Sequence, residues 1–167
     1  MLKNTIKHGI LGSYVLIDSW FVTDFMLKEI RKIRKGMLHV VGMCKMDKRK
    51  FDIGGKEYNS QTIVKMNEVK RGKVRESRKF RSRYMVVDAE YKGQPVKLFY
   101  IKYKNARNWT LLLTTDLSLS FTKAMELYQS RWSIEVMFKE CKQYLRFSKK
   151  KGHIEHIDKR NDIDELP

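Results

Sequence analysis

Four side chains that can contact phosphates or hold a metal ion recur at helical spacing toward the C-terminal end of the chain. They are Tyr128, Arg131, Glu135 and Lys142, and at about 100° per residue they fall within an arc of roughly 60° on one helix face. Arginine and lysine contact phosphates, and a carboxylate is the ligand that hard divalent cations prefer. The same row also fits a solvent-exposed face stabilised by charge pairs of about 0.2–0.5 kcal/mol each. Geometry alone leaves both interpretations open.

A second candidate carboxylate lies near the N-terminus. The apolar residues 14–17 run directly into Asp18, which predicts a buried strand that ends at a carboxylate. Apolar residues at helical spacing follow, with Thr23 or Asp24 as the N-cap and Gly36 as the stop. The N-terminal part of the chain is therefore predicted to be a strand, an aspartate and a helix.

The middle of the chain favours strands. We expect strands at residues 38–43, 84–91, 96–103 and 109–114, with a hairpin turn at 92–95 and a short helix at 60–66. Residues 68–83 hold eight Lys or Arg among sixteen residues, and they could be a solvated loop or a contact with a DNA backbone. A long helix then runs from Ser118 or Ser120 to Leu145, with an apolar stripe as its buried face: Leu127, Ile134, Phe138, Cys141 and Leu145.

Composition points to a polyanionic partner. The chain of 167 residues has 36 Lys and Arg against 19 Asp and Glu, a net charge of +17. DNA, RNA or an anionic membrane would fit such a charge, and the membrane ranks lowest because no segment pairs an apolar face with a uniformly basic one. No apolar run reaches the roughly 18 residues of a membrane span, and no secretion signal is recognisable. Cys44 and Cys141 stand apart as two reduced thiols, so we expect a cytoplasmic, nucleoid-associated protein.

The spacing of the four helix residues identifies a family. Tyr128-x2-Arg131-x3-Glu135-x6-Lys142 resembles the Y-(2)-R-(3)-E-(6)-K (YREK) signature of bacterial insertion-sequence DDE transposases of the insertion-sequence-four type. The flanking sequences TTDLS at 114–118 and RWSIE at 131–135 also look like this family. The segment DSWF that begins at Asp18 is similar to the end of the strand that carries the family's second catalytic aspartate. The resemblance covers residues 9–145.

The resemblance implies metal-dependent DNA chemistry. Such transposases use an RNase H-like fold in which three carboxylates, Asp, Asp and Glu, hold two divalent ions, Mg²⁺ or Mn²⁺. Asp18 matches the second aspartate and Glu135 the glutamate, so both are the expected catalytic and metal-binding residues. Two metal ions can activate the attacking oxygen and stabilise the leaving oxygen at a phosphodiester.

The resemblance also implies DNA contacts, to the insertion-sequence ends and to target DNA. Arg131 and Lys142 would hold phosphates near the cut, Tyr128 the terminal phosphate, and Lys139 a further phosphate. Trp109 could stack on a base flipped out near the cut, although a position in the core beside its leucine neighbours is the stronger expectation. An active complex could be a homodimer.

We therefore expect the mixed α/β (α+β) class, as a partial RNase H-like fold with an inserted β-rich subdomain and its N-terminal strands missing. The predicted parts are a strand and helix with the second aspartate (1–36), the inserted subdomain (37–115), the helix with the glutamate and the signature (116–145), and a divergent tail that we expect to be disordered (146–167).

The sequence departs from the family before Asp18, because none of the seventeen residues that precede it is Asp or Glu. We therefore expect a C-terminal fragment of a transposase that is inactive alone. The alternatives are a non-catalytic DNA-binding remnant, an RNase H-like nuclease that cuts without strand transfer, or a basic RNA-associated protein. Joined DNA would indicate the transposase, nicked DNA alone the nuclease, and neither product the DNA-binding remnant.

Overall fold

A computed structural model of the chain describes residues 4, 8–9 and 12–144. Within them it defines two compact units, one ending at Trp132 and one beginning at Ser133. The first unit holds one mixed sheet of eight strands and its helices, and the second holds the C-terminal part of the last helix. The mixed α/β class is therefore confirmed. Among the described residues, no helix combines the length and the apolar character that crossing a membrane requires.

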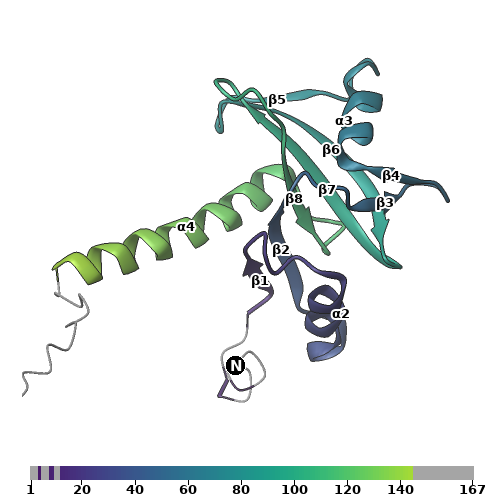
Figure 1. Cartoon of the computed structure of the whole chain (residues 1–167). Coiled ribbons are helices and arrows are strands. Elements are labelled where there is room, and N and C mark those ends of the chain that lie inside the picture. Colours follow the sequence, from purple (N-terminus) through teal and green to yellow (C-terminus); the bar gives the residue numbers. More distant parts are fainter. Residues whose placement is uncertain (1–3, 5–7, 10–11, 145–167) are drawn as a thin grey trace, which may run out of the picture. The chain divides into compact units, whose positions relative to one another are not determined.

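The sheet has the strand order β1-β2-β8-β7-β6-β3-β4, and β5 pairs with β6 (Figure 1). The bounds of the strands are β1 Tyr14–Ile17, β2 His39–Cys44, β3 Lys50–Asp52, β4 Glu57–Asn59, β5 Arg75–Ser77, β6 Ser82–Tyr91, β7 Gln94–Tyr103 and β8 Thr110–Thr114. Strands β1 and β2 are parallel, and every other pair is antiparallel. Strand β1 is an edge strand, with β2 as its one paired neighbour among the described residues.

The segment that joins β1 to β2 forms helix α2, Asp24–Lys32, as its sequence predicts. The Thr23 hydroxyl caps this helix by accepting a hydrogen bond from the Met26 N–H at 3.2 Å. A short 3₁₀ turn, Ile33–Gly36, follows, and Gly36 has φ 86°, a left-handed conformation that suits glycine. A parallel pair needs such a crossover connection, so α2 is what allows β1 to lie beside β2.

Strands β6 and β7 form the longest hairpin of the sheet, with Ser82 opposite Tyr103 at one end and Tyr91 opposite Gln94 at the other. The predicted four-residue turn is wrong in length. The turn is the pair Lys92 and Gly93, whose φ angles of 51° and 76° fit a two-residue hairpin loop. Pro95 lies within β7 because β8 pairs only with residues 97–101 of that strand, so no neighbour needs a proline N–H there.

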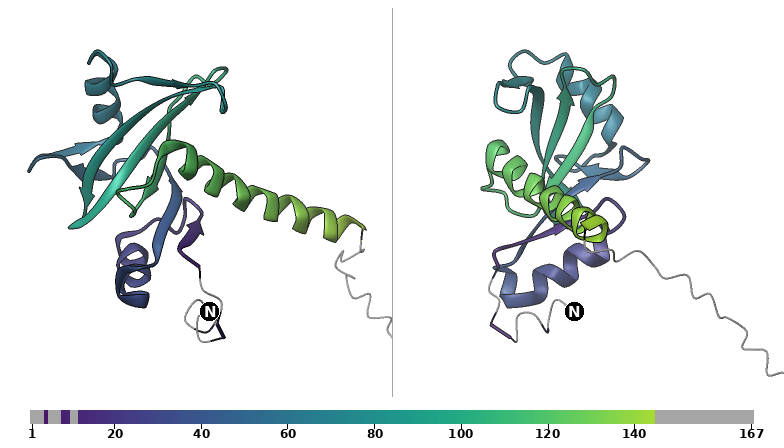
Figure 2. Two further views of the ribbon diagram at one scale, coloured as in Figure 1. Left: turned by 180° about the vertical axis from the view of Figure 1, so that it is seen from behind. Right: turned by 90° about the vertical axis from the view of Figure 1, so that its left-hand side faces the viewer.

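Alternate side chains of the sheet pack into two cores, one on each face. On one face, Val40, Leu98 and Leu111 lie in a cluster with helices α2 and α3, the latter spanning Ser60–Glu68. On the other face, the residues that follow these in sequence, Val41, Phe99 and Leu112, pack against the first turns of helix α4, Phe121–Tyr144 (Figure 2). This alternation with period two is that of a strand buried on both faces. It fixes which side of β1 can face α4.

Of the apolar stripe predicted along α4, Leu127 and Cys141 are partly buried and Ile134 is exposed, while the side chain of Phe138 lies outside the described residues. Leu127 packs against the second core cluster, whereas Ile134 in the second unit is 50% exposed. Leu145 lies outside the described residues. The helix begins after Ser120, whose hydroxyl accepts a hydrogen bond from the Lys123 N–H at 3.3 Å, as the N-cap prediction requires.

Candidate active site

Asp18 follows β1 directly, at the carboxyl end of the strand. Its Oδ1 accepts a hydrogen bond from the Ser19 N–H at 2.5 Å, and its backbone carbonyl accepts one from the Phe21 N–H at 2.9 Å. These bonds form a tight turn that holds the carboxylate at the end of the strand, while 43% of its side chain stays exposed. Asp18 is therefore both anchored and open to an approaching ligand.

Arg131 of α4 reaches this carboxylate. One of its terminal nitrogens, Nη2, lies 3.8 Å from Asp18 Oδ1, and its guanidinium lies 5.3 Å from the centre of the Tyr128 ring. Tyr128 and Arg131 are one helical turn apart on α4, so a cation–π contact between them orders the arginine side chain. An ion pair as exposed as this one adds at most about 1 kcal/mol to stability. The arrangement therefore brings a carboxylate, a guanidinium and a phenol from distant parts of the chain together.

Glu135 belongs to the second unit, four residues beyond Arg131 on the same helix, and its side chain is exposed. The backbones of Lys139 and Lys142 are in α4, but their side chains lie outside the described residues. Among the described residues, no group of three or more His, Cys, Asp or Glu is close enough to hold a metal ion. Asp18 and Glu135 are nevertheless oxygen donors of the kind that Mg²⁺ and Mn²⁺ prefer.

Trp109 precedes β8 and is partly buried against the first core cluster. Its indole N–H donates a hydrogen bond to Glu68 Oε1 at 3.0 Å, and the Lys102 ammonium lies 6.0 Å from its ring centre. These contacts give the side chain a structural role at the margin of the core. Base stacking by Trp109 stays a prediction.

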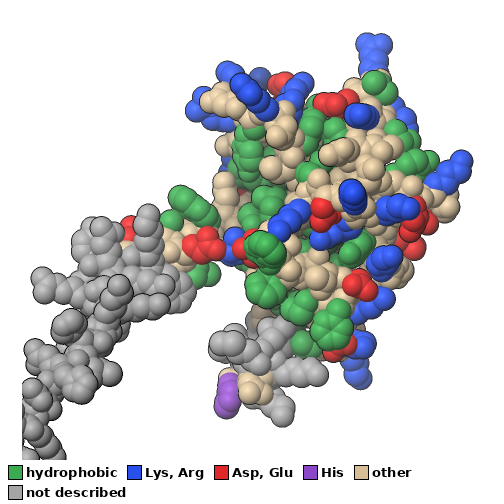
Figure 3. All heavy atoms as spheres, in the orientation of Figure 1, with side chains coloured by type: hydrophobic (Ala, Val, Ile, Leu, Met, Phe, Trp, Pro, Cys, Tyr) green, Lys and Arg blue, Asp and Glu red, His purple; other side chains and the backbone are tan. Residues whose placement is uncertain are grey.

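Exposed aromatic side chains lie next to Asp18 in sequence. Trp20 is 74% exposed and Phe21 is 59% exposed, and the Lys45 ammonium sits 3.3 Å from the centre of the Trp20 ring. Elsewhere on the first unit, basic side chains gather over the ends of β5 and β6 (Figure 3). The surface thus offers both stacking faces and positive charge.

Gly42 of β2 lies against the carboxyl end of β1. It pairs with Ile17 in the parallel ladder, and a Cβ built on it would lie 2.7 Å from Ile17 Cγ1 and 2.8 Å from Val22 Cγ2. No side chain fits in that space. Glycine at this position therefore lets β1 and the turn after Asp18 lie close against β2.

Asp116 is a buried carboxylate to which sequence reasoning gave no role. Its Oδ2 accepts a hydrogen bond from the Tyr14 hydroxyl at 2.6 Å, and its Oδ1 accepts bonds from the Ser118 hydroxyl at 2.7 Å and the Ser118 N–H at 2.9 Å. Burial opposes ionisation, but these bonds outweigh it and lower the pKa of Asp116 to about 2. The bond to Asp116, with burial, raises the pKa of Tyr14 to about 12.

Asp116 follows β8 and contacts the first residue of β1, so it lies at the end of the sheet away from Asp18. It is a structural group that ties the start of β1 to the connection between β8 and α4. The Asp-x-Ser pattern after a strand signals such a turn, but nothing in the local sequence points to Tyr14 as the partner.

Comparison with known families places the chain as a whole. The sequence model of one family, described as a transposase DDE domain, matches residues 1–155. The chain therefore belongs to the transposase DDE domain family, which implies a nuclease or transferase kind of activity on DNA. No curated protein and no solved structure matches the chain.

Proposed function

We propose that this chain supplies two carboxylates, Asp18 and Glu135, to a metal-dependent site that cuts DNA and joins its strands. The observation that carries the proposal is the 3.8 Å approach of Arg131 to Asp18, which links the helix with the YREK spacing to the carboxylate after β1. Family membership supports the same conclusion. Two divalent ions bound by the carboxylates would activate the attacking oxygen and stabilise the leaving oxygen.

The protein's own residues offset the repulsion between a carboxylate and a DNA phosphate. The Arg131 guanidinium lies beside Asp18 and can turn a terminal N–H toward a phosphate oxygen, while the Tyr128 hydroxyl can donate a hydrogen bond to the same group. In the proposal, Lys139 and Lys142 contact further phosphates along α4. The net charge of +17 brings DNA to the site.

An RNase H-like arrangement is part of the proposal. The parallel pair β1–β2 with Asp18 at its carboxyl end is compatible with it, and a strand that carries the first carboxylate would pair with the edge of β1 that has no partner among the described residues. Residues 1–17 contain no Asp or Glu. On this proposal the chain alone binds DNA without cutting or joining it, because two carboxylates cannot replace three.

A plasmid-cleavage and strand-transfer assay with Mg²⁺ or Mn²⁺ tests the proposal, together with DNA binding by fluorescence anisotropy. We expect the chain to bind duplex DNA and to yield neither nicked nor joined product. If the chain alone yields joined product and Asp18→Asn abolishes it, the proposed inactivity of the chain is refuted, but the proposed role of Asp18 is supported. Nicked product alone would favour a nuclease.

Glu135→Gln provides a second test. It should preserve DNA binding, or improve it by removing one negative charge, and it should abolish any metal-dependent product. Asp88→Asn is the matched control, because Asp88 is an exposed carboxylate on β6 whose side chain is 72% exposed. A chain that binds no DNA would refute the proposed function.

A further inference from the structure

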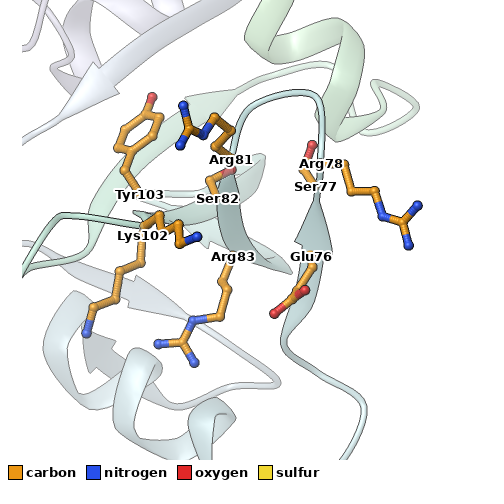
Figure 4. A pocket seen from close by; sticks show the side chains of 9 residues that line it. Glu76, Ser77, Arg78, Arg81, Ser82, Arg83, Lys102 and Tyr103 are labelled. Atoms are coloured by element: carbon orange, nitrogen blue, oxygen red, sulfur yellow. The ribbon is translucent and has the colours of Figure 1, made fainter.

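The turn between β5 and β6 opens into a basic pocket of about 620 Å³, which we call the turn pocket (Figure 4). Its lining comes from the turn itself and from the adjacent ends of β5, β6 and β7. It is lined by Glu76, Ser77, Arg78, Arg81, Ser82, Arg83, Lys102, Tyr103 and Lys104. Five of these side chains are cations and one is an anion, so the pocket suits a negatively charged ligand.

The turn that carries the pocket is anchored by contacts with helix α4. Phe80, within the turn, is buried and meets the ring of Phe121 edge-on with centroids 5.8 Å apart. Its neighbour Lys79 forms an ion pair with Glu126 of α4 at 2.5 Å. The backbone of Arg81 is left-handed, with φ 47°, which is unfavourable for arginine. A strained residue in an anchored turn is typical of a binding site that is formed before its ligand arrives.

The charges of the turn pocket are not balanced within the protein. Arg83 and Lys102 are direct partners across the β6–β7 ladder, where like charges destabilise a sheet, and Glu76 on β5 lies opposite Arg83 and offsets part of this repulsion. In the part of the chain that the structure describes, none of the five cations of the turn pocket forms an ion pair. This excess of positive charge favours a bound anion.

The pocket also contains a hydrogen-bonding group without a partner. Ser82 is 6% exposed, and its Oγ is buried without any hydrogen-bond partner among the described residues. A buried polar group left in this way costs stability, so Ser82 is a local weak point of the anchored turn.

The pocket adjoins the candidate active site through two tyrosines. Tyr103, which lies opposite Ser82, has its pKa raised by burial and by the neighbouring Tyr128 of α4. Tyr128 in turn stacks with Arg131, which reaches Asp18. Basic and hydroxyl side chains thus follow one another from the turn pocket to the candidate carboxylate, all within the first unit.

We propose that the turn pocket binds a phosphate of the DNA backbone, as one end of a track that leads through Tyr103 and Tyr128 to Asp18. The inference rests on the proposed function and adds to it a second anchor for the same duplex. Because the ligand is the sugar–phosphate backbone, binding at the turn pocket is independent of base sequence.

Arg81→Gly tests the pocket with little risk to the fold, because glycine accepts the left-handed backbone that arginine occupies under strain. Lys92→Gly is a matched control. It removes one exposed positive charge from another left-handed turn position, at the opposite end of the β6–β7 hairpin. The two variants have the same net charge, and thermal unfolding should show that both are at least as stable as the wild type.

The readout is the affinity for a duplex of about 30 base pairs, measured by fluorescence anisotropy between 50 and 300 mM NaCl. Loss of one phosphate contact lowers the slope of log K against log salt by about 0.9, which is about eightfold in affinity at 0.1 M salt. We expect this loss for Arg81→Gly, and no change of slope for Lys92→Gly. Ser82→Ala should leave the slope unchanged and should not lower the melting temperature, because its buried hydroxyl has no partner to lose.

Equal effects of Arg81→Gly and Lys92→Gly, in a wild type that binds DNA, would refute the turn pocket and leave the proposed function intact. A wild type that binds no DNA would refute both. A loss seen only on duplex RNA of the same sequence would overturn the assignment of the ligand as DNA.

Discussion

The buried carboxylate of Asp116 makes the stability of the first unit depend on pH in a calculable way. Asp116→Asn keeps the shape of the side chain and removes its ionisation. The pKa of Asp116 falls from 3.8 to about 2 on folding, and each unit is about 1.36 kcal/mol, so the ionised form contributes about 2.5 kcal/mol at pH 7. Because the folded-state pKa is the lower one, this contribution is present above pH 3.8 and is lost as the pH falls through 2. At pH 3 about 1.3 kcal/mol remains.

Urea unfolding followed by circular dichroism at pH 7 and pH 3 measures these quantities. We expect Asp116→Asn to lower the free energy of unfolding by about 2.5 kcal/mol at pH 7 and by about half as much at pH 3. The control is Asp88→Asn, which should change stability by less than about 0.5 kcal/mol at pH 7. An equal loss at both pH values would refute the reasoning, since the effect would then not depend on the ionised carboxylate.

Two further predictions concern the support of β1 and the thiols. Gly42→Ala should lower the free energy of unfolding by about 1–3 kcal/mol, measured by the urea midpoint, because its Cβ would meet Ile17 Cγ1 at 2.7 Å. Gly12→Ala, where the nearest atom is 3.7 Å away, should change it little, and equal effects would contradict the steric argument. Burial raises the pKa of the Cys44 thiol to about 12, so Ellman's reagent should label the half-buried Cys141 first and Cys44 only on unfolding. Labelling of both thiols at one rate in the folded protein would contradict this.

Local sequence signals predicted much of the fold. The strand-like runs at 84–91 and 96–103 predicted the β6–β7 hairpin, although with too long a turn, and α3 was predicted as a short helix at 60–66. Strands β3 and β4 were not predicted, because each spans three residues within a charged segment. Runs that short show no period that could be told from a loop.

The candidate site was less accessible from local signals. Asp18 and Arg131 were both predicted, but their proximity followed from the family resemblance and not from any spacing. The Tyr14–Asp116 bond joins residues 102 positions apart, and neither side chain is unusual in its own segment. Contacts of this kind depend on the order of strands in the sheet, which periodicity does not encode.

The 102-residue span between Tyr14 and Asp116 also affects the order in which parts of the molecule fold. The β6–β7 hairpin closes over a two-residue loop, whereas the Tyr14–Asp116 bond closes a span of 102 residues and the Asp18–Arg131 ion pair a still longer one. Local contacts form before distant ones, because closing a long loop costs more conformational entropy. We therefore expect the hairpin, with one wall of the turn pocket, to form early, and the junction between Asp18 and α4 to form last. The carboxylate end of the site would then be the first part lost when the first unit is destabilised.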